Sequence, residues 1–157
     1  MREHATKKPN RLDPERLEQC ACLSARKTAR AVTRAFDAAL APSGLEATQF
    51  TVLAALAGAS QTVGSLAREL VMDRTTLSRN VQPLRRLGLV SIRPDRDARR
   101  RVVALTGAGS RKLKAAFPLW RKAQRETMAA VGRTRFVDAL ESMSELTAAA
   151  IAPRSNR

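Results

Sequence analysis

Residues 74–80 combine arginines with small hydroxyl and amide side chains, a mixture suited to recognising nucleic acid. The polar members are Arg74, Thr75, Thr76, Ser78, Arg79 and Asn80. Arginine donates paired hydrogen bonds to guanine O6 and N7, whereas hydroxyl groups bind phosphates or base edges at close range. Asp73 is a typical helix N-cap, so the stretch predicts the first turns of a helix that lies in a DNA groove. The alternative is a solvated polar helix face that Asp73 caps.

A second basic segment lies between two short stretches of alternating apolar and polar residues. The alternation at 89–93 and 101–105 predicts two β-strands, and the turn-rich residues between them predict a hairpin. Its charged residues are Arg93, Arg96, Arg99, Arg100 and Arg101 against Asp95 and Asp97. Beside a reading helix, such a hairpin can place an arginine in the minor groove, where negative potential is concentrated. The alternative is a charged hairpin that contacts only solvent.

The charge of the whole chain points to a polyanionic partner. Its 157 residues contain 29 Lys and Arg against 14 Asp and Glu, which gives a formal net charge of +15 and a sequence pI near 11.6. Residues 66–101 contain ten arginines and four acids, so much of the charge gathers on the predicted helix and hairpin. Nucleic acid is the first candidate partner, and an anionic membrane surface is the second.

The elements that must position these residues are mostly helical. Aromatic residues make up only 3% of the chain, so Leu, Val and Ala must fill most of the core, and this composition favours helices. Apolar residues at helical spacing predict helices over 14–40, 47–57, 64–71, 74–87, 107–131 and 135–152, with a short strand at Thr62-Val63. Start and stop signals are Asp13-Pro14, Gly88, Thr106 and the segment 132–134, whereas Pro83 and Pro118 lie inside predicted helices.

The order helix, helix, turn, helix, hairpin is that of a winged helix-turn-helix domain. The predicted fold class is therefore mainly α with a small β-hairpin wing. We expect a disordered basic tail at 1–12, an N-terminal dimerisation helix at 13–44, a winged helix-turn-helix DNA-binding domain at 45–106, C-terminal helices at 107–152 and a tail at 153–157.

Four short motifs occur in an order that resembles the MarR (multiple antibiotic resistance regulator) family. They are Thr75-Thr76-Leu77-Ser78-Arg79-Asn80-Val81, Leu87-Gly88-Leu89-Val90, Asp97-Ala98-Arg99 and Leu105-Thr106-Gly107-Ala108-Gly109. The resemblance covers residues 13–152 as an ordered set of elements. Pro83 and the three consecutive arginines at 99–101 depart from the common pattern of the family.

The resemblance implies a transcriptional regulator that binds double-stranded DNA as a homodimer joined by its first and last helices. It implies that Arg99 enters the minor groove at the wing tip and that Asp97 steadies it. It also implies a crevice where a small ligand binds and releases the DNA, which is the behaviour of a repressor. Two-fold symmetry then predicts a near-palindromic operator with half-site centres about 10 bp apart. The expected apolar anchors of the dimer are Leu17, Phe136, Leu140 and Met143.

The crevice implied by the resemblance lies between the DNA-reading lobe and the dimerisation helices. By position, the residues that line it are Phe36, Phe50, Phe117 and Trp120. These rings favour an effector that is partly aromatic or apolar.

Two cysteines in the predicted first helix raise a different function, thiol-based redox sensing. Cys20 and Cys22 are two residues apart, so in a helix they point about 200° away from each other and do not readily form a bridge. A free cysteine is more commonly a small packing residue. We therefore expect Cys20 and Cys22 to serve packing, with redox regulation as the alternative function.

The sequence gives no support to an enzyme. It has no glycine-rich phosphate-binding motif and no nucleophile elbow. With His4 as the single histidine, no Ser-His or Cys-His pair is available within the fold, and no cluster of metal ligands occurs. We expect no cofactor. The second candidate class is a basic architectural protein that binds nucleic acid without regard to sequence.

The sequence also lacks the signals of a membrane or exported protein. No apolar run reaches the length of about 18 residues that a membrane span needs. Residues 1–11 are polar and basic, without the apolar stretch of a signal peptide. We therefore expect a cytoplasmic protein.

Overall fold

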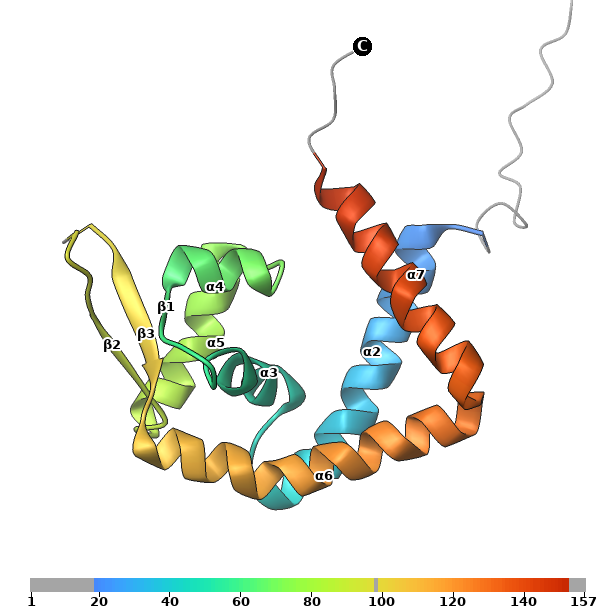
Figure 1. Cartoon of the computed structure of the whole chain (residues 1–157), viewed down its shortest axis with the longest axis horizontal. Helices are drawn as coiled ribbons and strands as arrows, with labels where there is room; N and C mark the ends of the chain where they lie inside the picture. Colours follow the sequence, from blue (N-terminus) through green and yellow to red (C-terminus); the bar gives the residue numbers. More distant parts are fainter. Residues whose placement is uncertain (1–18, 98, 153–157) are drawn as a thin grey trace, which may run out of the picture. The chain divides into compact units, whose positions relative to one another are not determined.

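Helices and one small sheet make up the computed structural model, which describes residues 19–97 and 99–152 (Figure 1). The elements are α2 (Ala21–Leu40), the 3-10 turn η1 (Ala41–Ser43), α3 (Ala47–Ala55), β1 (Gln61–Thr62), α4 (Val63–Glu69), α5 (Arg74–Arg86), β2 (Val90–Pro94), β3 (Arg101–Leu105), α6 (Gly107–Val131) and α7 (Arg133–Ile151). The mainly helical fold class with a small wing is confirmed. The chain divides into two compact units at Arg34 and Ala35, within α2.

The first predicted helix starts later than its apolar periodicity indicates. Gln19 lies in a turn and Cys20 is not helical, so α2 begins at Ala21. The amide of Ser24 donates to the carbonyl of Cys20 at 3.0 Å, which makes Cys20 the residue that opens the helix. The prediction of one continuous helix through residues 19 and 20 is therefore wrong. Spacing alone cannot detect this break, because apolar residues keep their period across it; the proposed start at Asp13-Pro14 lies outside the described residues.

Local side-chain caps set the beginnings of the three helices that follow. Glu46 and Gln49 form a capping box at α3, with the Gln49 side chain accepting from the Glu46 amide at 3.2 Å. Thr62 accepts a hydrogen bond from the Ser65 amide at 3.1 Å, so Val63 is already the first residue of α4. The strand predicted at Thr62-Val63 therefore lies at Gln61–Thr62 in the structure and does not include Val63. The caps place α3, α4 and α5 in the predicted order.

The turn between α4 and α5 contains a strained residue. Val71 has a φ of 52°, in the left-handed region that β-branched residues rarely adopt. The Met72 amide donates to the Ala67 carbonyl at 2.8 Å and the Val71 amide to the Arg68 carbonyl at 3.2 Å, a Schellman closure of α4. Such a closure usually has glycine at the left-handed position. The tight turn thus carries a strain of about 1–2 kcal/mol that glycine would avoid.

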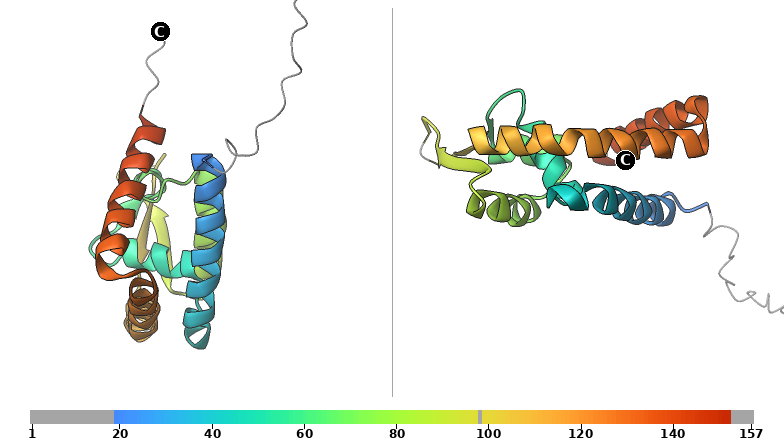
Figure 2. Two further views of the ribbon diagram at one scale, coloured as in Figure 1. Left: turned by 90° about the vertical axis from the view of Figure 1, so that its right-hand side faces the viewer. Right: turned by 90° about the horizontal axis from the view of Figure 1, so that it is seen from below.

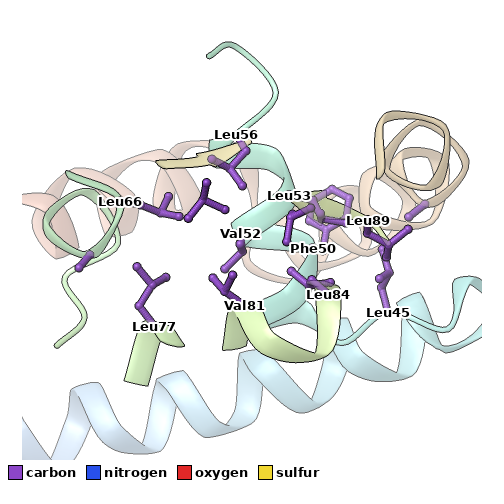
Figure 3. Packing of buried hydrophobic residues seen from close by; sticks show 14 of the residues in the cluster. Leu45, Phe50, Val52, Leu53, Leu56, Leu66, Leu77, Val81, Leu84 and Leu89 are labelled. Carbon is purple, nitrogen blue, oxygen red and sulfur yellow. The ribbon is translucent and has the colours of Figure 1, made fainter. Parts of the chain in front are cut away.

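The apolar sides of α3, α4 and α5 meet in one core (Figure 3). Figure 3 shows Leu77, Val81 and Leu84 of α5 turned toward the side chains of α3, among them Leu53. Leu77 and Leu84 are completely buried, and the three residues recur at the spacing of one helix face. This packing fixes which side of α5 faces outward.

The wing is the larger part of a three-stranded antiparallel sheet with strand order β1-β3-β2. β2 pairs with β3 from Val90 opposite Leu105 to Pro94 opposite Arg101, and β1 adds Gln61 opposite Val103. The strands agree with the predicted hairpin, except that β2 spans Val90–Pro94 and is thus shifted by one residue from the predicted 89–93. Val103 is completely buried, because it lies on the central strand and faces the core.

One compact junction joins the end of α5, the start of β2 and the start of α6. Gly88, with a φ of 67°, ends α5 as predicted, and the Thr106 hydroxyl donates to its carbonyl at 2.7 Å. Thr106 also caps α6, since its hydroxyl oxygen accepts from the Gly109 amide at 3.0 Å. A Cβ on Gly109 would lie 2.0 Å from the Leu89 carbonyl oxygen, so only glycine fits there. These contacts explain physically the Leu-Thr-x-x-Gly pattern noted in the sequence.

Helix α6 extends from the junction to Val131, and α7 follows it after Gly132, which has a φ of 91°. The predicted break at 132–134 is too long, because Arg133 already begins α7; Gly132 alone supplies the conformation that the break needs. No residue of α7 is buried within the chain. Its exposed large apolar residues are Val137, Leu140, Met143, Leu146 and Ile151.

Candidate nucleic-acid interface

The exposed side of α5 forms a shallow open groove opposite its buried leucines. The hollow has a volume of about 500 Å³, and its lining residues are Arg74, Thr75, Ser78, Arg79, Gln82 and Arg86. The structure therefore brings four of the six helix residues singled out in the sequence onto one surface. Three guanidinium groups along one face suit phosphate and guanine, and the two hydroxyls permit close approach.

Thr76 and Asn80 are turned away from this groove. The Thr76 hydroxyl donates to Asp73 Oδ2 at 2.6 Å, and the Thr76 amide donates to Asp73 Oδ1 at 2.8 Å. The Asn80 amide group donates to Met72 Sδ at 3.6 Å, toward the turn before α5. Both residues were included in the predicted site by polarity. Their contacts here assign Thr76 to the helix cap and Asn80 to the turn.

Gln82 and Arg86 are groove residues that the sequence reasoning missed. They follow Thr75 and Ser78 along the same face, at the three- and four-residue spacing of a helix. The signal was available, because extending that spacing beyond Asn80 leads to both residues. They lengthen the candidate contact surface by two turns toward the C-terminus of α5.

Asp73 fixes the N-terminus of the reading helix. Its carboxylate accepts from the side chain and the amide of Thr76, and these hydrogen bonds hold the pKa of Asp73 below its ordinary value. The first-turn amides of α5 and the positive end of its dipole lie beside Arg74 and Thr75. The free amide donors and the positive end of the dipole would both favour a phosphate at this end of α5.

The wing tip carries the second group of predicted residues, all of them exposed. The Arg99 amide donates to Asp97 Oδ1 at 3.1 Å, and the Arg100 guanidinium lies 3.4 Å from Asp97 Oδ2. The Arg96 amide donates to Asp95 Oδ1 at 2.8 Å. Asp97 thus shapes the turn around the backbone of Arg99 and pairs with Arg100. The guanidinium groups of Arg96 and Arg99 have no partner among the described contacts, and so can reach outward.

Three of the four aromatic residues predicted for a crevice form a stack. The rings of Phe50 and Trp120 have centroids 5.9 Å apart, and those of Phe117 and Trp120 are 5.4 Å apart. Phe50 is buried in the core, whereas Phe117 is 45% exposed at the outer end of the stack. Phe36 of α2 is half-buried. The structure gives no stacking contact for Phe36, so it is not joined to the other three.

Neither of the two cysteines is buried within the single chain. Cys22 is exposed in the first turn of α2, and Cys20 is half-buried just before it. Both are free thiols. The argument from helical angles holds only if both residues are helical, and Cys20 is not. The predicted separation of about 200° therefore loses its premise.

Other kinds of site find no support in the described part of the chain. Among residues 19–97 and 99–152, no group of three His, Cys, Asp or Glu side chains could hold a metal ion. None of the described helices combines the length and the apolar character that crossing a bilayer requires.

A helix-turn-helix with an exposed basic groove, followed by a basic antiparallel wing, defines the class of winged-helix DNA-binding proteins. A model of the MarR family matches residues 43–101. The transcriptional regulator MosR of M. tuberculosis, solved in complex with DNA, is 40% identical with a TM-score of 0.70, covering 82% of this chain and 98% of its own. The chain belongs to the MarR family of DNA-binding transcriptional regulators, which are not enzymes.

Two further solved structures share the fold at lower identity. A cysteine-to-serine mutant of MarR from E. coli, complexed with operator DNA, is 22% identical, with a TM-score of 0.70 and coverage of 77% of this chain and 89% of its own. A MarR-family regulator from Rhodococcus sp. RHA1 is 20% identical, with a TM-score of 0.69 and coverage of 77% and 87%. No match was found among curated protein sequences.

Proposed function

We propose that this protein is a sequence-specific regulator that binds a near-palindromic operator as a homodimer and acts as a repressor released by a small ligand. The observation that carries the proposal is the α5 groove, where Arg74, Thr75, Ser78 and Arg79 share one exposed face. The wing extends from the same domain and presents Arg96 and Arg99. A reading helix for the major groove and a basic wing for the minor groove together favour recognition of sequence over general attraction to DNA.

Selection of bound sequences from random DNA tests the specificity. Arg79→Ala should change the preferred base at one position of the selected site, at a cost of about 1–3 kcal/mol. Arg99→Ala should weaken binding to all DNA sequences alike and should make the affinity less dependent on salt, because it removes a charge that contacts the minor groove or the DNA backbone. Equal losses of both variants on operator and random DNA would mean that α5 does not read sequence.

The homodimer is supported by the unburied apolar side of α7. Leu140 and Met143 are 48% and 46% exposed in the single chain, at the spacing of one helix face. Phe136 on the same helix is half-buried, and Leu17 lies outside the described residues. Leu140→Glu should convert a dimer of 17.1 kDa chains to monomers in sedimentation and abolish tight operator binding. A wild-type monomer that binds its operator tightly would contradict the proposal.

The ligand part of the proposal is supported by the outer end of the aromatic stack. Phe117 presents an exposed ring next to Trp120, so a planar aromatic or apolar effector could extend the stack. A screen for small molecules that release the selected operator tests this. Phe117→Ala should weaken release by an active compound without changing operator affinity in its absence.

A second candidate function, thiol-based control through Cys20 and Cys22, is favoured by the exposure of Cys22 and the non-helical backbone of Cys20. Oxidation would give a sulfenic acid, an internal bridge or a link between subunits. A peroxide titration should compare the wild type with a double Cys→Ser variant, by operator release and a non-reducing gel. Release from both proteins, or from neither, would rule out this control and leave a packing role within the assembly.

A further inference from the structure

The outer face of α6 carries a row of basic side chains separate from the reading helix and the wing. Its members, called here the α6 stripe, are Arg111, Lys114, Arg121, Lys122 and Arg125, all of them exposed. At 3.6 residues per turn they fall within about 100° of the helix circumference and extend over about 21 Å of its length. The stripe is therefore one continuous surface rather than a scatter of charges.

The stripe lies opposite the side by which α6 joins the core. Ala116 belongs to the core, and both Ala116 and Ala123 are buried about half a turn from the stripe. When the molecule is seen from below, no other described element of residues 35–152 crosses in front of α6 (Figure 2, right). The stripe is therefore open to a partner within this unit.

The charge of the stripe is almost unopposed. α6 contains six basic residues and one acid, Glu126, whose Oε1 lies 3.8 Å from Lys122 Nζ at the edge of the stripe. This helix of 25 residues has a net charge of +5. Residues 66–101, which include the reading helix and the wing, contain ten basic residues and four acids, a net charge of +6. α6 thus approaches the reading elements in charge and exceeds them in charge per residue.

The stripe and the α5 groove lie on different sides of the same domain. α3 packs against both α5 and α6. The buried sides of the two outer helices, with Leu84 on α5 and Ala116 on α6, belong to the one core that α3 shares. Because each basic surface is the side of its helix that points away from this core, a duplex in the α5 groove leaves the stripe uncovered.

We propose that the α6 stripe binds the phosphate backbone of a second DNA duplex, without regard to sequence, while α5 and the wing hold the operator. A duplex carries one negative charge for about every 1.7 Å of its axis, which a row of cations over about 21 Å can follow. The protein would then bridge two DNA segments. This inference rests on the proposed operator binding by α5.

Two other polyanionic partners fit the stripe less well. Binding to an anionic membrane needs an apolar helix face that inserts beside the cations. On α6, Leu113, Leu119 and Trp120 pack against the core, which leaves the exposed ring of Phe117 as the one large apolar side chain close to the stripe. A protein interface usually has an apolar centre within its polar rim, whereas the uncharged residues between Lys114 and Arg121 on the stripe side of α6 are the small Ala115 and Pro118. Phosphate binding requires only the cations.

The test uses the full-length protein bound to an immobilised operator duplex. After free protein is washed away, a labelled duplex of unrelated sequence is added, and its retention is measured between about 0.05 and about 0.2 M salt. The test variant is the pair Lys114→Gln and Arg121→Gln, and the matched control is Arg133→Gln with Arg135→Gln on α7. Both variants lose two exposed cations, and neither pair is part of the α5 groove or the wing.

The wild type and the α7 control should retain the second duplex, and the stripe variant should bind it about 50-fold more weakly at about 0.1 M salt, as expected for two lost phosphate contacts. Loading of protein on the operator should stay within about threefold. No retention by the wild type, equal losses in both variants, or loss of operator loading in the stripe variant would each overturn the proposal. Preferential retention of anionic vesicles or an acidic peptide would also overturn it. Failure of wild-type protein to load at all would instead contradict operator binding.

Discussion

Replacing Gly109 by alanine should strongly destabilise the protein, although the change adds a single methyl group. The new Cβ would lie 2.0 Å from the Leu89 carbonyl oxygen, 3.0 Å from the Leu89 carbonyl carbon and 2.8 Å from Leu105 Cδ1. Two of these atoms belong to backbone, so no side-chain rotation relieves the overlap. The first turn of α6 must move away from the backbone of Leu89.

The cost can be worked out from the contacts that such a movement breaks. Thr106 donates two hydrogen bonds across the junction. Its hydroxyl donates to the Gly88 carbonyl at 2.7 Å and also lies 3.1 Å from the Leu89 carbonyl oxygen, and its amide donates to the Leu89 carbonyl at 3.1 Å. Each contributes about 1 kcal/mol net, and overpacking adds about 1–3 kcal/mol. We expect a total loss of about 3–5 kcal/mol, a large fraction of the stability of a typical domain.

Gly107, in the same turn, supplies a matched control. A Cβ there would meet only the end of the Arg111 side chain, at 3.7 Å, which is an ordinary contact. Gly107→Ala should therefore leave stability unchanged or raise it by up to about 1 kcal/mol through helix propensity.

Thermal and urea unfolding of both variants would measure these effects. For a chain of this size, about 1 kcal/mol shifts Tm by roughly 2–4 °C, so Gly109→Ala should lower Tm by about 6–20 °C. An unchanged midpoint for Gly109→Ala, or an equal fall for Gly107→Ala, would refute the reasoning that the close approach at Leu89 requires glycine.

Three further predictions concern the helix-turn-helix. Val71→Gly should raise stability by about 0.5–1 kcal/mol in urea unfolding, because relief of left-handed strain exceeds the entropy cost of glycine; a loss of stability would contradict the strain. Asp73→Asn should keep most of the cap at neutral pH but remove its acid sensitivity. Since the pKa of Asp73 is lowered in the folded state, its contribution is present above the unfolded carboxyl pKa and disappears as pH falls through the folded one, so unfolding curves of the two proteins should converge in acid. Asn80→Ala should leave the base preference of selected DNA unchanged, in contrast to Arg79→Ala, because the Asn80 amide group contacts Met72; an altered preference would return Asn80 to the reading surface.

Elements whose boundaries depend on local chemistry could be predicted from the sequence. Asp73 and Gly88 enclose the reading helix, and both act as the N-cap and C-terminal signals predict. Alternation located the wing strands to within one residue. The helix was predicted to continue through Pro83, because the apolar spacing of Leu77, Val81 and Leu84 continues past it, and α5 does include Pro83.

Features that depend on tertiary contacts, or on the direction of a side chain, could not be predicted in this way. Residue type placed Thr76 and Asn80 in the reading surface, but their hydrogen bonds direct them elsewhere. The break before α2 leaves no trace in apolar spacing. The pattern at Thr106 and Gly109 was visible in the sequence, yet its cause is the approach of α6 to the backbone of Leu89, far away along the chain.

The junction at Gly88, Thr106 and Gly109 also determines where this molecule can vary in length. Both strands of the wing are anchored at their base, so an inserted residue near Gly88 or Thr106 would break the contacts that hold α6. At the tip no such anchor exists among the described residues. Because side chains alternate between faces, insertions there preserve the buried face only when each strand grows by two residues, which would lengthen the wing by about 7 Å. As related sequences diverge, the length of the wing along DNA can therefore change in steps of two residues per strand. The reading helix and the junction that holds α6 keep their dimensions.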